Sequence, residues 1–200
     1  MKKKIFEYFA HPIFQYKLEN FKILNEELLK YIYKLKEDNP KSQKLSNING
    51  WHSPFFLLND KTSDGYKFFL QVQPYIYDVF KSYGWAYNPK KIKCSGMWAI
   101  INKKGNFNTE HIHPNCNLSG AYYVKAPENC GDFKVFTPNS ITRDKYPVRE
   151  KPTELNRVVA QLKVQEGDML IFPSHLPHSV LPNESEEDRI VISFNLYIDR

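Results

Sequence analysis

Apolar residues follow two different spacings along the chain, and the change between them falls near residue 90. In residues 18–36 they recur at i, i+3, i+4 and i+7 with lysine and glutamate between them, which is the pattern of an amphipathic helix. A second helix is predicted over residues 65–83, where Pro74 is expected to introduce a kink. Residues 12–16 are expected to form a short strand, and residues 41–59 a polar loop.

After Pro89 the pattern becomes that of short strands separated by turns. The expected strands are residues 92–102, 107–113, 118–125, 132–136, 157–164, 168–172, 178–181 and 189–197. A polar loop is expected over residues 137–150. Frequent turns between short strands indicate an all-β sandwich or barrel. We therefore expect one structural domain, mainly β, in which residues 1–90 form a helical support packed on a sheet and residues 91–200 form the β core.

Composition narrows the class of protein. The 200 residues are 42% hydrophobic and 15% aromatic, which is well above a disordered composition. The three cysteines are scattered and form no CxxC motif, which favours reduced thiols in a cytosol-like compartment. No apolar run approaches the ~20 residues that span a bilayer, and the start of the chain has no signal-peptide core. We expect a soluble, cytoplasmic protein without membrane association.

The net charge of +6 is mild. Lysines cluster at residues 2–4, 41–44 and 90–93, but polar or apolar residues interrupt each cluster and no nucleic-acid-binding signature accompanies them. Solvated faces explain these clusters better than a nucleic-acid groove does. Binding to nucleic acid is therefore not expected, although the sequence does not exclude it.

Four of the six histidines lie in two short clusters, Glu110-His111-Ile112-His113-Pro114 and His175-Leu176-Pro177-His178. Imidazole is the commonest protein ligand of metals. Side chains alternate between the faces of a strand, so His111 and His113 are expected to point the same way. A fold that returns His178 to this face would place three ligands on one metal.

Each of these features alone has an ordinary explanation. A His-x-His pair occurs by chance on many strands, and Arg189 could be a surface arginine closing the acidic loop 184–188. Their order is more specific. His178 follows His113 after 64 intervening residues, and Arg189 follows after 10 more, where it opens an apolar strand.

This order resembles that of the iron(II)- and 2-oxoglutarate-dependent dioxygenases, whose double-stranded β-helix carries H-x-D/E, a distal histidine and an arginine on the next strand. More closely, the chain resembles small oxygenases of that superfamily from marine bacteria and their phages. The similar stretches are Ser46-Asn47 through Ser53, His111 to Pro114, Leu118 to Val124, and Glu166-Gly167-Asp168 through Val180. The resemblance covers almost the whole chain and is densest over residues 98–194.

The resemblance implies a double-stranded β-helix (jelly-roll, cupin-like) fold and three cofactors or cosubstrates: Fe(II), 2-oxoglutarate and O2. The implied reaction is hydroxylation of an unidentified substrate, with succinate and carbon dioxide as co-products. That substrate could be a small molecule or a peptidyl residue. A homodimer is possible, and the compartment would be the host cytoplasm if a phage encodes the protein.

One position departs from the family pattern. The usual carboxylate two residues after the first histidine is His113 here. Imidazole suits iron(II), so we take His111, His113 and His178 as the expected triad. An alternative register makes His113 the first ligand and puts Asn115 in the acid position, where water could replace it. Glu110 is a weaker candidate, because strand alternation points it away from His111.

The resemblance assigns Arg189 to the distal carboxylate of 2-oxoglutarate, which a guanidinium can bind with two hydrogen bonds. In the family a serine or threonine follows two residues after this arginine. Here that position is Val191, and Ser193 comes four residues after Arg189 on the same face. Tyr123 is expected to face inward and give the carboxylate a second donor, although a core aromatic is nearly as good an explanation.

Four further residues are possible parts of the site. His52 and Trp51 lie in a loop that could cover it, and Trp98 and Asn102 could form its floor, although core packing is the default for each. His175 is expected at the mouth and not as a ligand.

Two competing hypotheses remain open. One is a three-histidine metal enzyme that does not use 2-oxoglutarate, such as a cupin-type dioxygenase or a hydrolase. The other is a non-catalytic ligand-binding β-helix domain, for which the missing carboxylate is the best argument.

Overall fold

The computed structural model describes residues 3–5, 8–56, 58–85, 88–144 and 147–199. Its helices are α1 (Phe21–Asp38), α2 (Asp64–Ser82) and the short α3 (Ser140–Asp144), with a 3-10 turn at Pro89–Lys91. Its strands are β1 (Phe14–Lys17), β2 (Asn47–Ile48), β3 (Trp51–His52), β4 (Ile92–Asn102), β5 (Phe107–His111), β6 (Leu118–Lys125), β7 (Phe133–Phe136), β8 (Val159–Leu162), β9 (Asp168–Pro173), β10 (His178–Val180) and β11 (Arg189–Ile198).

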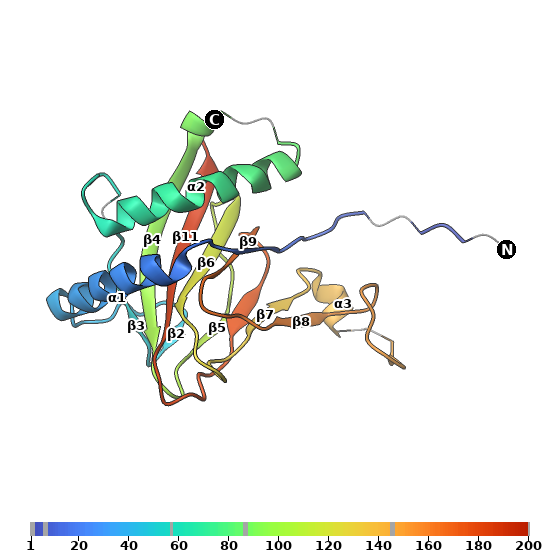
Figure 1. Ribbon diagram of the computed structural model, residues 1–200. Coiled ribbons are helices and arrows are strands. Elements are labelled where there is room, and N and C mark those ends of the chain that lie inside the picture. The colour runs from blue at the N-terminus through green and yellow to red at the C-terminus, as the bar shows by residue number, and fades with distance from the viewer. Residues whose placement is uncertain (1–2, 6–7, 57, 86–87, 145–146, 200) are drawn as a thin grey trace.

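The strands form two antiparallel sheets. The larger sheet has the order β1-β9-β6-β11-β4-β3, and the smaller has the order β2-β5-β10-β7-β8. Helices α1 and α2 lie across the outer face of the larger sheet (Figure 1). The mainly β architecture with helices from the N-terminal part agrees with the sequence-based prediction.

Alternation along the strands of the larger sheet divides its side chains between two environments. On β11, Ile190, Ile192, Phe194 and Leu196 are fully buried in the cluster that also contains Leu28 and Ile32 of α1 and Phe68, Val72 and Ile76 of α2. Burying each such side chain contributes roughly 1.5–3 kcal/mol. The residues between them on β11 face the opposite way, toward the smaller sheet.

Helix α2 has a side-chain cap at its start and a proline in its interior. The side chain of Ser63 accepts a hydrogen bond from the backbone N–H of Tyr66 at the start of the helix, which satisfies one of the free donors there. The helix continues from Asp64 to Ser82 with Pro74 inside it. Proline cannot donate the backbone hydrogen bond of that position. The apolar contacts of the buried face compensate for the loss of this bond.

The region predicted as a polar loop contains two strands of two residues each. Strand β2 pairs with β5 of the smaller sheet, and β3 pairs with β4 of the larger sheet. Residues 47–52 therefore cross from one sheet to the other and join them at one edge; we call this segment the clasp. Two-residue strands have no periodicity to detect in a sequence.

Two other local differences have similar causes. Helix α3 lies within the predicted loop 137–150, and with five residues it is too short to show a helical period. Strand β5 ends at His111 and not at residue 113. The expected division of the chain at residue 90 stays a prediction, although β1, β2 and β3 from before that point add strands to both sheets.

No helix in the described part of the chain is both long and apolar enough to cross a membrane.

Candidate active site

The inner faces of the two sheets enclose a cavity of about 420 Å³. On the larger sheet, Arg189 pairs with Asn102 and Ser193 pairs with Trp98 across β11 and β4. On the other side of β11, Val191 pairs with Tyr123 of β6. Directly paired residues share a face, so this register places one row of side chains on the cavity wall. The residues that line the cavity include Ser46, His52, Phe55, Trp98, Asn102, Asn108, His111, His113, Tyr123, His178, Arg189, Ser193 and Asn195.

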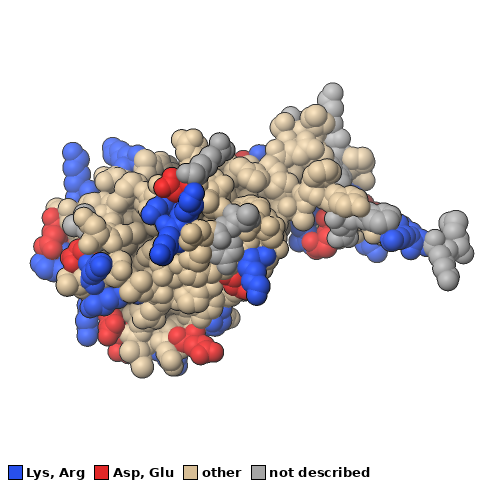
Figure 2. All heavy atoms as spheres, turned by 90° about the horizontal axis from the view of Figure 1, so that it is seen from above, with Lys and Arg blue, Asp and Glu red and all other residues tan. Residues whose placement is uncertain are grey.

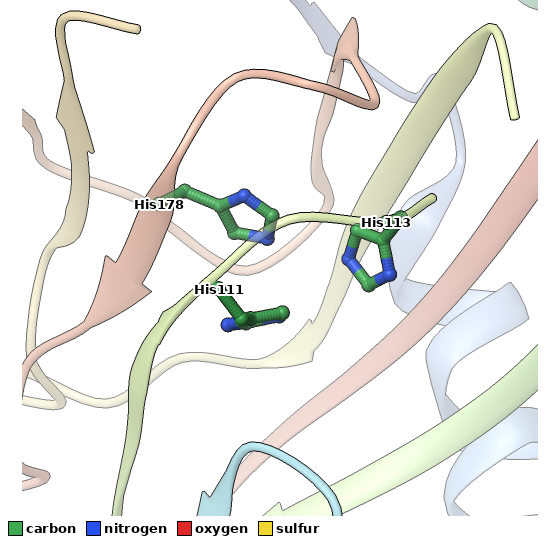
Figure 3. A group of neighbouring side chains, drawn as sticks. All are labelled: His111, His113 and His178. Atoms are coloured by element: carbon green, nitrogen blue, oxygen red, sulfur yellow. The ribbon is translucent and has the colours of Figure 1, made fainter. Parts of the chain in front are cut away.

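Three histidines converge on this cavity: His111 and His178 from the smaller sheet, and His113 from the segment that follows β5. His178 of β10 lies directly across from His111 of β5, and one ring nitrogen from each of His111, His113 and His178 lies within 4.8 Å of the others. Figure 3 shows the three rings turned toward one another. Nitrogen atoms at this spacing can bind one metal ion together.

His113 reaches the group by a different route from the one predicted. The prediction relied on strand alternation, but β5 ends at His111, so alternation does not determine the direction of His113. Its backbone N–H instead donates to the carbonyl of Ser174 at 2.9 Å. Asn115, with φ of 63°, then turns the chain. The expected convergence is present, and loop contacts produce it.

Backbone carbonyls orient two of the rings. Nδ1 of His111 lies 2.7 Å from the carbonyl oxygen of Thr109, and Nδ1 of His178 lies 2.9 Å from that of Leu176. A carbonyl only accepts, so each Nδ1 carries a hydrogen and each Nε2 keeps its lone pair. This is the usual arrangement of metal-binding histidines.

Burial keeps all three rings neutral at pH 7. It lowers the pKa of His111. Burial, together with the neighbouring histidines, lowers the pKa of His113 to about 4 and that of His178 to about 3. Neutral imidazole is the form that binds a metal.

These pKa values predict an acid-sensitive metal-free protein. In the unfolded chain each histidine titrates near 6.5, so below that pH the unfolded state binds more protons than the folded state does. The free energy of unfolding should therefore fall as pH decreases below 6.5, with a slope that approaches about 1.4 kcal/mol per pH unit for each of His113 and His178. Urea unfolding in EDTA between pH 6.5 and 5 measures this slope. His178→Gln should show a shallower slope than the parent protein, and equal slopes would contradict the assignment.

Arg189, the first residue of β11, is fully buried. Its Nη1 donates to the carbonyls of Cys130 and of Leu181, the latter at 2.9 Å. Its Nε and Nη2 are also buried, and neither has a hydrogen-bond partner among the described residues. Buried donors without partners are rare in folded proteins. Two adjacent guanidinium donors on a cavity wall match the two oxygens of a carboxylate.

Tyr123 and Ser193 occupy the inward positions that were predicted for them. Both line the cavity, and Tyr123 is 1% exposed. Burial raises the pKa of Tyr123, and Arg189 opposes that change, which places the phenol within electrostatic range of the guanidinium. The phenol is therefore a neutral hydrogen-bond donor at pH 7.

Other predicted residues divide into those on the cavity and those away from it. His52, Trp98 and Asn102 line it, and the His52 and Trp98 rings stack 5.6 Å apart. Trp51 instead packs in the core beneath the helices and donates from Nε1 to the carbonyl of Asn39.

Glu110 and His175 lie outside the cavity lining. Glu110 accepts two hydrogen bonds from Arg143 of α3, at 2.7 and 2.9 Å, and so points away from the histidines as alternation predicted. The expectation that His175 lies at the mouth is wrong. Its ring packs against His11 at 5.3 Å and lines a separate hollow with Trp85 and Cys116.

Several lining residues were not anticipated from the sequence, among them Asn195, Asn108, Ser46 and Phe55. Asn195 could have been found, because it follows Arg189 and Ser193 at even spacing on one strand. The others depend on the clasp and on the register between β5 and its neighbours, which no pattern in the sequence reveals.

Two facing antiparallel sheets with three histidines converging between them have the architecture of a double-stranded β-helix that carries a candidate metal site. A family model described as "Putative 2OG-Fe(II) oxygenase" matches residues 96–195. The chain belongs to this family of 2-oxoglutarate- and Fe(II)-dependent oxygenases. A search of curated proteins found no match.

Solved structures share the fold. A prolyl-4-hydroxylase from Pseudomonas putida is 11% identical with a TM-score of 0.66, and the match covers 96% of this chain and 94% of that one. A Trichoplax adhaerens prolyl hydroxylase, solved with a peptide of hypoxia inducible factor, is 13% identical with a TM-score of 0.62 over 92% and 83%. HygX from Streptomyces hygroscopicus, solved with nickel, 2-oxoglutarate and hygromycin B, is 10% identical with a TM-score of 0.60 over 93% and 82%. The predicted double-stranded β-helix is confirmed.

Membership of the family confirms the predicted activity class and cofactors. The protein is an oxidoreductase that uses Fe(II) and 2-oxoglutarate. The structure fits both groups, because three neutral imidazoles line one cavity with a buried guanidinium, two of whose donors lack a hydrogen-bond partner among the described residues. The hypotheses of an enzyme without 2-oxoglutarate and of a non-catalytic domain are not favoured.

Proposed function

We propose that His111, His113 and His178 hold the Fe(II), and that Arg189, Tyr123 and Ser193 bind 2-oxoglutarate, in an enzyme that hydroxylates its substrate and releases succinate and carbon dioxide. The observation that carries this assignment concerns buried Arg189, which lines the same cavity as the three histidines: two of its donors have no hydrogen-bond partner among the described residues. A dicarboxylate reaching from a metal to this guanidinium would satisfy both.

Each residue has a defined task in this proposal. The Nε2 lone pairs of His111 and His178 are free because their Nδ1 atoms donate to carbonyls. In this proposal Arg189 neutralises and orients the distal carboxylate, and Tyr123 and Ser193 donate hydrogen bonds to it. The bound iron supplies oxygen activation. The chain positions the reactants and keeps water out of the site.

The remaining wall is suited to the substrate. Leu45, Phe55 and Ile112 line the cavity while staying 64%, 54% and 48% exposed, so an apolar rim leads inward past His52 and Trp98. The structures of the Trichoplax enzyme and of HygX contain a peptide and hygromycin B, respectively. We propose that a small molecule or a peptidyl residue enters over this rim.

We further propose that the enzyme is cytoplasmic, that it assembles as a homodimer, and that it does not bind nucleic acid. On the face shown in Figure 2, basic side chains lie in separate groups with acidic side chains among them. This pattern supports solvated faces and not a nucleic-acid groove.

Binding of 2-oxoglutarate should depend on the metal. We expect calorimetry under anaerobic conditions to show tight binding with Fe(II) present and at least about tenfold weaker binding in EDTA, since the metal accounts for one end of the contacts. Succinate, which lacks the keto group, is the matched control and should show a smaller dependence on iron. Equal affinity for 2-oxoglutarate with and without iron would contradict a joint site.

A further inference from the structure

His113 differs from the other two histidines in what its Nδ1 contacts. Nδ1 of His111 and of His178 each face a backbone carbonyl. Among the hydrogen bonds of the described residues, Nδ1 of His113 faces the side-chain amide of Asn195, with Nδ2 of the amide 3.5 Å away. A carbonyl can only accept, whereas an amide side chain can either accept or donate. The tautomer of His113 is therefore set by the orientation of one amide.

The amide of Asn195 belongs to a buried hydrogen-bond chain. The hydroxyl of Ser119 donates to its Oδ1 at 2.8 Å, and the Ser119 hydroxyl lies 2.9 Å from that of Ser174. Ser119 and Ser174 are 1% and 0% exposed. Ser119 pairs with Asn195 across β6 and β11, and the carbonyl of Ser174 accepts from the backbone N–H of His113. The series of hydrogen bonds therefore begins and ends at His113.

The direction of this chain decides whether His113 can bind a metal. With Nδ2 directed at His113, Nδ1 of the ring accepts and its hydrogen lies on Nε2, the nitrogen on the other side of the ring. A nitrogen that carries a hydrogen has no lone pair for a metal. Turning the amide by 180° reverses each bond: Nδ1 of His113 donates to Oδ1, Nδ2 donates to Ser119, and Ser119 donates to Ser174. Nε2 is then free.

We propose that Asn195 is the positioning residue of the third metal ligand, and that it admits the metal when its amide presents Oδ1 to His113. This inference rests on the proposed three-histidine centre. Two fixed carbonyls keep His111 and His178 ready for the metal, and the third site is completed by a side chain that can turn. The Trp98 ring, 5.8 Å from the His113 ring, packs beside it. Asn195 therefore sets the hydrogen position while the loop sets the ring position.

Three substitutions test the proposal through metal affinity. Asn195→Leu keeps the volume but removes the acceptor, and it should weaken Co(II) binding by roughly 10- to 100-fold, as losses of partners to metal-bound histidines usually do. Asn195→Asp can only accept, so it should bind Co(II) at least as tightly as the parent protein. Ser119→Ala removes the partner of the turned amide and should weaken binding to an intermediate extent. Asn25→Leu, a buried asparagine on α1 that bonds Tyr122, is the matched control and should leave affinity unchanged.

A second readout reports the tautomer itself. Proton–nitrogen correlation spectra of the imidazoles should place the hydrogen of His113 on Nδ1 in the Zn(II)-loaded parent, and in Asn195→Asp even without metal. In the metal-free parent a substantial fraction should carry it on Nε2. A purely structural role for Asn195 would not move this hydrogen.

The outcomes separate this inference from the assignment beneath it. If Asn195→Leu binds Co(II) within twofold of the parent, or if Asn195→Asp loses as much affinity as Asn195→Leu, Asn195 does not position the ligand. His111→Ala in the same series reports on the centre. If His111→Ala also keeps its affinity for Co(II), both the three-histidine assignment and the role of Asn195 are wrong. If His111→Ala loses the metal while the Asn195 variants keep it, only the role of Asn195 is overturned.

Discussion

Replacing His113 with alanine should lower succinate formation from 2-oxoglutarate by more than about 100-fold, since even an indirect partner of a metal ligand is commonly worth 10- to 100-fold. The variant removes one of three nitrogen atoms that lie within 4.8 Å of one another. The assay is succinate production in air after anaerobic loading with Fe(II), and slow turnover without the substrate suffices for it. His113→Asp restores a carboxylate of the kind common in the superfamily, and we expect it to retain activity.

The matched control is His175→Ala, which removes a histidine three residues before His178 but outside the cavity. It should leave succinate formation within about twofold of the parent, because surface substitutions away from a site have small effects. Full activity in His113→Ala would show that His113 is not a ligand. The register with His113 as first ligand is tested by His111→Ala, which in that case would remain active.

The second large effect is expected at Arg189, which lines the same cavity as the three histidines. Arg189→Met keeps much of the side-chain volume but removes the two free guanidinium donors, and it should raise the Kd for 2-oxoglutarate by about 100-fold or more, since truncating one partner of a buried charged pair costs 2–5 kcal/mol. Fe(II) affinity should be unchanged. Arg189→Lys keeps the charge but cannot form the two-pronged contact, so its Kd should lie between those of Arg189→Met and the parent.

Arg189 also has a structural task, which the experiment must separate from binding. Its Nη1 holds the carbonyls of Cys130 and Leu181, so both variants should have lower thermal midpoints. Lys125→Met removes a cation on β6 that pairs with Glu187 and serves as the control for charge alone. If Arg189→Met binds 2-oxoglutarate as tightly as the parent while remaining folded, the cosubstrate lies elsewhere.

The sequence predicted the parts of this protein that repeat or alternate. The helical period gave α1 and α2 to within a few residues, and strands such as β4 and β6 matched their predicted ranges. The order of His111, His178 and Arg189 led to one shared cavity. These predictions succeeded because apolar burial on one face repeats at a fixed interval.

What the sequence did not yield depends on contacts between distant segments. Strand β5 stops at His111, and a hydrogen bond to Ser174, 61 residues later, brings His113 into the group. His175 turned away from the mouth because its ring packs against His11. The contact between His113 and Asn195 depends on the register of β11 with β6, and no interval in the sequence encodes that register.

The clasp contributes to the cavity from a part of the sequence that contains none of the proposed metal or 2-oxoglutarate ligands. Every proposed ligand of the metal and of 2-oxoglutarate lies within residues 96–195, the segment shared with the family. Ser46 and Phe55, which flank the clasp, and His52 within it lie outside that segment, yet they line the wall left for the substrate. Mutations that accumulate there can change what the enzyme oxidises while its oxygen chemistry stays intact. In the history of such a protein, selectivity and reactivity would therefore be free to evolve at different rates.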